Sequence, residues 1–91
     1  MQQGKEKNLH LTRVVGKIIR EIRIQKTGLS CAKIADEFDL DRGNLNRIEN
    51  GLIDSKFTTI WKVSEALGLK FSEFAKLLEQ ELGEDFTLID E

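Results

Sequence analysis

The 91-residue chain contains no proline, one cysteine and one histidine. The scarcity of cysteine and histidine excludes internal disulfides and argues against metal sites and nucleophilic catalysis. A lone cysteine, Cys31, forms no internal disulfide and supplies no metal cluster. His10 is the only histidine. A metal site or a nucleophile-base pair would need His10 and Cys31 to meet with further ligands, and the sequence offers no second such pair. We therefore expect no metal, no cofactor and no enzymatic activity.

Long apolar segments are also missing. No run of about 18 apolar residues occurs, which excludes a membrane-spanning helix. Residues 1–8 lack the apolar core of a signal peptide. These absences predict a cytoplasmic protein without a membrane partner.

The absence of proline, together with glycines that separate segments of helical periodicity, predicts an all-α domain of five helices. Apolar residues at helical spacing predict a first helix from about Leu11 to Lys26. We expect an N-terminal arm over residues 1–10, the helical domain over 11–83 and an acidic tail over 84–91. The stripe of the first helix comprises Leu11, Val14, Val15, Ile18, Ile19 and Ile22.

Capping residues delimit two short helices in the middle of the chain. Ser30 is expected to cap a helix over residues 31–38, with Ile34, Ala35 and Phe38 facing inward. Asp41 is expected to cap the next helix, which runs to residue 50. Gly51 then takes the left-handed position that often ends a helix.

Two further helices complete the domain. The fourth ends at Gly68, and its Trp61 is expected to pack in the core. The fifth is expected to be capped by Ser72 and to end at Gly83. The apolar stripes comprise Phe57, Ile60, Trp61, Ser64 and Leu67 in the fourth helix, and Phe74, Leu77, Leu78 and Leu82 in the fifth.

The two short helices have the dimensions of a helix-turn-helix, in which the second helix enters a DNA major groove. At about 100° per residue, one face of that helix carries arginine, asparagine and glycine, and the other is apolar apart from Glu49. Arginine and asparagine are the side chains that pair with guanine and adenine edges. The alternative is an ordinary solvated face.

The segment from Val14 to Leu78 resembles the Cro/C1-type (XRE family) helix-turn-helix regulators. The runs that carry the resemblance are Ile22-Arg23, Gly28-Leu29-Ser30, Ile34-Ala35, Arg47-Ile48-Glu49-Asn50-Gly51 and Glu65-Ala66-Leu67-Gly68-Leu69. The resemblance implies a lambda-repressor-like domain with the helix-turn-helix at helices 2 and 3. It also implies a structural ion pair between Arg23 and Glu49.

The resemblance further implies DNA-contacting positions. Phosphate contacts are expected at Ser30, Cys31, Asn50 and Lys56, although Cys31 stands where the family commonly has a glutamine. Gly43 has no side chain with which to read a base, and close approach of its backbone to DNA is one rationale for it. The expected base-contacting residues are Arg42, Gly43, Asn44, Asn46 and Arg47.

One such helix covers few base pairs, so we expect a homodimer on a palindromic operator of double-stranded DNA. The fifth helix and the tail are the expected interface, through Leu77, Leu82, Leu88 and Ile89. The function expected is that of a phage-type repressor or a restriction-modification controller protein. The alternative is an antitoxin or adaptor that binds a protein through its C-terminal helix and tail.

The net charge of -2 argues against DNA binding, but the charge is unevenly distributed along the chain. Residues 1–50 carry 10 Lys and Arg against 7 Asp and Glu, whereas residues 51–91 carry 4 against 9. The sequence therefore predicts a modestly basic DNA-facing side and an acidic C-terminal side. With so few basic residues, non-specific affinity should be low.

Overall fold

The computed structural model describes residues 2–89, with side chains from residue 5 onward, and over that range it is all-helical. Helix α1 (Gln2–Ile22) continues into a π-helical turn, η1 (Arg23–Thr27). Four shorter helices follow: α2 (Cys31–Glu37), α3 (Arg42–Glu49), α4 (Phe57–Ala66) and α5 (Phe71–Leu82). None of the helices in this range is long and apolar enough to cross a bilayer.

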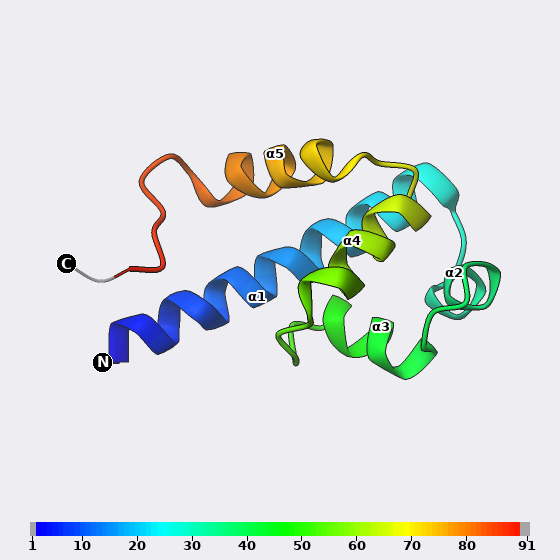
Figure 1. The fold of residues 1–91 in the computed structure, drawn as a ribbon, viewed down its shortest axis with the longest axis horizontal. Coiled ribbons are helices and arrows are strands. Elements are labelled where there is room, and N and C mark those ends of the chain that lie inside the picture. Colours follow the sequence, from blue (N-terminus) through cyan, green and yellow to red (C-terminus); the bar gives the residue numbers. More distant parts are fainter. Residues whose placement is uncertain (1, 90–91) are drawn as a thin grey trace.

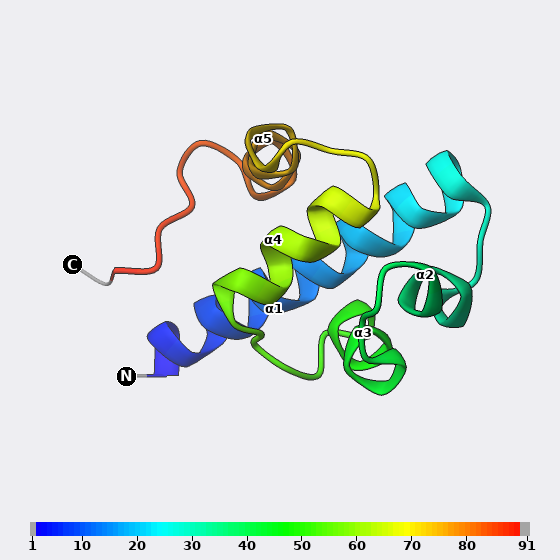
Figure 2. The same ribbon diagram turned by 45° about the vertical axis from the view of Figure 1, so that its right-hand side comes forward.

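Helix α1 is the axis of the molecule. Helices α2 and α3 lie beside its C-terminal half, and α5 lies on its other side (Figure 1). Helix α1 packs against α3 and α5, α2 packs against α3, and α4 packs against α5. The turned view shows the same arrangement, with the tail beside the start of α1 (Figure 2).

The core draws on all five α-helices. Helix α1 supplies four of its buried residues, and Phe74 of α5 is fully buried. The core comprises Val14, Ile18, Ile19, Ile22, Ile34, Ala35, Leu45, Ile48, Val63, Ala66, Leu67 and Phe74. All four predicted stripes supply part of this core, the fourth helix through Leu67.

The first helix begins well before the predicted residue, so residues 2–10 are helical rather than an arm. The tail contacts this added segment, because the ring of Phe86 lies 5.9 Å from that of His10. Lys7 Nζ also lies 3.4 Å from Thr87 Oγ1. The described part of the tail, which was expected to contact a partner, folds back on α1 through Phe86, and its Leu88 and Ile89 remain exposed. Residues 90 and 91 lie outside the described range.

Three details of the predicted helices are wrong. Phe38 is 46% exposed, because α2 ends at Glu37 and the chain turns into the left-handed region at Asp39. Trp61 is 43% exposed, because at about 100° per residue it lies on nearly the opposite side of α4 from the buried Val63. Helix α5 starts at Phe71 rather than after Ser72.

The start of α5 has a clear physical reason. Glu73 Oε1 accepts a hydrogen bond of 2.8 Å from the Lys70 backbone N–H, which would otherwise be free at the helix start. Phe71 packs at the same time against the rings of Phe57 and Trp61, with centroids 5.0 and 4.7 Å away. We call these three residues the aromatic cluster.

Candidate nucleic-acid interface

Helices α2 and α3 form the helix-turn-helix, and a side chain caps each of them. Ser30 Oγ accepts from the Lys33 backbone N–H at 3.1 Å, and an Asp41 carboxylate oxygen accepts from that of Asn44 at 2.7 Å. Between the helices, the Leu40 N–H donates to the Ala35 carbonyl at 2.7 Å. The predicted caps therefore form, and they fix the first residues of both helices.

An ion pair ties α3 to the end of α1. Arg23 Nε and Nη2 donate to the two carboxylate oxygens of Glu49 at 2.7 and 2.8 Å. Arg23 Nη1 also donates to the Leu29 carbonyl at 2.7 Å, so one guanidinium joins η1, the loop before α2, and α3. Only 12% of the Arg23 side chain and 5% of the Glu49 side chain are exposed. Because desolvating such a pair is expensive, we expect it to orient α3 more than it adds stability.

The outer face of α3 is polar and exposed. Arg42, Gly43, Asn46 and Arg47 are exposed, whereas Leu45, Ile48 and Glu49 are buried. This division agrees with the helical geometry of the sequence. Asn44 is only half-exposed and borders a small cavity against Thr59 and Val63 of α4, which places it at the edge of this face.

The side chains of the outer face are partly ordered by contacts within the protein. Asn50 Nδ2 donates to the backbone carbonyl and to Oδ1 of Asn46, at 2.9 and 3.2 Å. Arg47 reaches back along the helix, since a Cβ added to Gly43 would lie 3.3 Å from Arg47 Nη1. Arg42 is held by Asp36 of α2, through hydrogen bonds from Nε (2.8 Å) and Nη2.

The expected phosphate contacts occupy different environments. Ser30 and Lys56 are exposed at the residues preceding α2 and α4, and the Ser30 hydroxyl already caps its helix. Cys31 is half-buried, and burial raises the pKa of its thiol above the usual value. The thiol is therefore neutral near pH 7 and does not repel a phosphate. These residues do not contact one another through any hydrogen bond in the described part of the chain.

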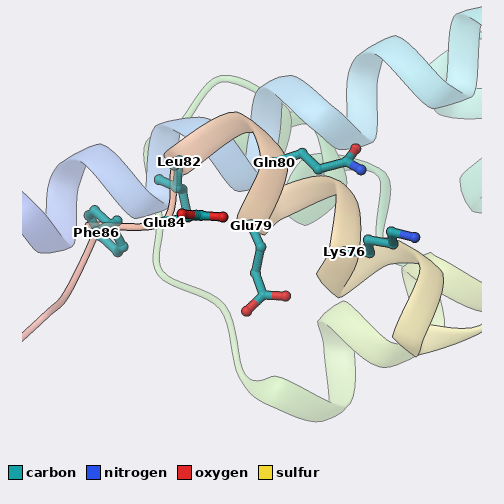
Figure 3. Close-up of a pocket in the computed structure, with 7 residues that line it drawn as sticks. Lys76, Glu79, Gln80, Leu82, Glu84 and Phe86 are labelled. Carbon is teal, nitrogen blue, oxygen red and sulfur yellow. The ribbon is translucent and has the colours of Figure 1, made fainter.

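The residues expected at the dimer interface fall into two groups that differ in exposure. Leu77 and Leu82 are half-buried and pack against the core, whereas Leu88 and Ile89 are 43% and 76% exposed. Figure 3 shows Leu82 and Phe86 beside α1, in an open hollow whose other lining side chains include Glu79 and Glu84. These carboxylates make the hollow unsuited to phosphate, and it lies away from α2 and α3 (Figure 1).

Sequence reasoning missed two residues. Gly16 lies in the middle of α1 and is buried against the end of α3, and a glycine inside an otherwise continuous helical stripe was the available signal. Asp36 was not among the expected site residues, and only the turn between α2 and α3 brings it to Arg42. Gly16 affects the position of α3 against α1, and Asp36 affects the orientation of the Arg42 side chain on α3.

Comparisons with known proteins agree with this geometry. Residues 19–74 match the family model described as helix-turn-helix, a span from α1 into α5. The chain is 35% identical over 66 residues to the control protein C.MunI of a Mycoplasma species, covering 72% of this chain and 89% of that protein. It is 38% identical over 55 residues to the control protein C.BamHI of Bacillus amyloliquefaciens, covering 60% of this chain and 68% of that protein. The chain belongs to the Cro/C1-type helix-turn-helix family and is a DNA-binding transcriptional regulator.

Proposed function

We propose that this regulator binds a palindromic operator as a homodimer, with α3 of each copy in the major groove, and acts as a control protein of a restriction-modification operon. The observation that carries the proposal is the outer face of α3, where Arg42, Asn46 and Arg47 are exposed while the buried Arg23–Glu49 pair fixes the helix. The similarity to two control proteins supports the kind of operon.

The proposed mechanism is binding without catalysis. Two copies related by a two-fold axis place their α3 helices about 34–36 Å apart, one turn of duplex, and so read two half-sites. DNA as the partner also favours the cytoplasm as the location. We do not extend the proposal to an antitoxin or adaptor, because the described tail packs against α1 through Phe86.

Selection of bound duplexes from a random pool tests this function directly. We expect a consensus of two inverted half-sites whose centres are about 10 base pairs apart. A pool without enrichment, or a single unpaired half-site, would contradict the dimeric operator. The selected duplex then serves for measurements on variants.

Replacing Arg47 by alanine is expected to weaken binding to the selected operator by about 1–3 kcal/mol and to relax the preference at one base pair of each half-site. The reason is the loss of a side chain that pairs with a base edge. Binding is measured by titration of labelled duplexes at several salt concentrations. The control, Lys56→Ala, should weaken all duplexes alike and lower the salt slope by about one. An Arg47→Ala protein that selects the same consensus with equal affinity would show that α3 does not read the operator through this residue.

We place the dimer contact at the aromatic cluster rather than at Leu77 and Leu82, which the core already covers in part. Phe57 is 63% exposed and Trp61 is 43% exposed, although their rings pack on Phe71. Aromatic side chains of this kind bury about 150–250 Å² each at interfaces. The cluster is therefore apolar surface that a second copy can cover.

Trp61→Glu is expected to convert the dimer into a monomer, because it places a carboxylate in the apolar contact. Sedimentation velocity measures the change, and thermal unfolding checks that the variant still folds. The matched variant Leu88→Glu changes an exposed apolar residue of the tail and should leave the dimer intact. If Leu88→Glu dissociates the dimer and Trp61→Glu does not, the interface lies at the tail.

A further inference from the structure

Asp36 and Arg42 form an exposed ion pair across the turn of the helix-turn-helix. Asp36 lies in the last turn of α2, and Arg42 is the first residue of α3. Arg42 Nε donates to Asp36 Oδ1 at 2.8 Å, and Arg42 Nη2 donates to Asp36 Oδ2. More than half of each side chain is exposed, at 57% for Asp36 and 63% for Arg42.

Among the residues that the structure describes, Asp36 occupies one edge of the guanidinium and no hydrogen bond occupies the other. A guanidinium has five N–H groups in a fixed planar fork. Asp36 takes the N–H of Nε and one N–H of Nη2. The edge formed by Nη1 and Nη2 keeps two parallel donors, which is the arrangement that pairs with O6 and N7 of guanine.

The pair has little value for folding. Exposed ion pairs of this kind contribute little to stability, because water and salt screen them. The hydrogen bonds from Arg42 also hold the pKa of the Asp36 carboxyl below its usual value, so Asp36 is charged near neutral pH. A negative charge beside the DNA-facing helix opposes binding to phosphates.

We propose that Asp36 is a positioning residue that fixes the Arg42 guanidinium so that its free edge reads a guanine in each half-site. The inference rests on the proposed function, since it requires α3 in the major groove. An arginine that is already held in one orientation loses less side-chain entropy on binding. It also presents its donors in one direction, which penalises any base that lacks the two acceptors of guanine.

The test compares base preference rather than affinity alone. Starting from the selected operator, each base pair of the half-site is replaced in turn, and binding of the full chain is measured by competition. The variants are Asp36→Ala, Arg42→Ala and the double variant. Glu37→Ala is the matched control, because it removes the same charge from the neighbouring residue and no hydrogen bond to Arg42 involves Glu37 in the described residues.

We expect Arg42→Ala to abolish the preference for guanine at one position, and Asp36→Ala to lower that same preference about tenfold. The other positions should keep their preferences, and the double variant should resemble Arg42→Ala because both residues act on one contact. Glu37→Ala should change binding to all duplexes by a common factor. Thermal unfolding of Asp36→Ala should match that of the unaltered protein, since the pair is exposed.

Two results would overturn the proposal while the proposed function stands. In the first, Asp36→Ala strengthens binding to every duplex by the same factor as Glu37→Ala and the guanine preference persists. In the second, Asp36→Ala alters a position that Arg42→Ala leaves unchanged. If the unaltered protein selects no consensus, the proposed function fails first and this inference fails with it.

Discussion

Replacing Gly16 by alanine is expected to lower the free energy of unfolding by about 3 kcal/mol or more, the upper end of what overpacking costs. A Cβ at residue 16 would lie 2.2 Å from the Ile48 carbonyl oxygen and 2.8 Å from that of Glu49. These atoms belong to the backbone of α3, so no side-chain rotation relieves the overlap. Helices α1 and α3 must move apart, which opens the core and tilts α3.

Chemical denaturation and thermal unfolding measure this effect. For a chain of this size, a loss of about 3 kcal/mol lowers Tm by more than about 10 °C. The matched control is Gly43→Ala on the exposed face of α3, where the nearest atom to the added Cβ is the mobile end of Arg47 at 3.3 Å. There the better helix propensity of alanine should raise stability by up to about 1 kcal/mol. Equal effects of the two substitutions would refute the close approach of α1 and α3.

Glu49→Ala is expected to destabilise the domain by about 3–5 kcal/mol, because it leaves the Arg23 guanidinium buried without its partner. Arg23 would keep its hydrogen bond to the Leu29 carbonyl and lose both bonds to Glu49. Chemical denaturation and thermal unfolding measure this loss of stability as well. Asp36→Ala serves as the control, since it breaks an ion pair in water and should change stability little.

The double variant Arg23→Met/Glu49→Met separates orientation from stability. Replacing both partners by apolar residues removes the buried charges, so it should recover most of the stability that Glu49→Ala loses. If the pair orients α3, this variant should fold and yet discriminate less sharply among operator sequences. A double variant as unstable as Glu49→Ala would show that the pair itself stabilises the fold.

The polar outer face of α3 could be predicted in detail from the sequence. Helical geometry alone separates Arg42, Asn46 and Arg47 from Leu45 and Ile48, and the structure has the same division. The caps at Ser30 and Asp41 also follow from local chemistry, because each side chain bonds to a backbone N–H three residues ahead. Such features depend on neighbours in the chain, which the sequence displays.

Features that depend on contacts between distant segments were missed or misplaced. The first helix extends back to Gln2, in a segment that the tail contacts through Phe86. The spacing of Trp61 predicts a core position, but Trp61 lies on the side of α4 away from the buried Val63, stacked on Phe71. Its helical position permitted either environment.

The sequence by itself determined the all-α class, the helix-turn-helix and the exposed polar face of α3, because helix periodicity, capping and the face of one helix are local properties. The tertiary structure decided how that helix is held. The contact of Gly16 with the end of α3, and the capture of Arg42 by Asp36, each join residues that come together only when the helices pack. Gly16 must lack a side chain because α3 packs against it, and the charge of Asp36 matters because Arg42 lies beside it.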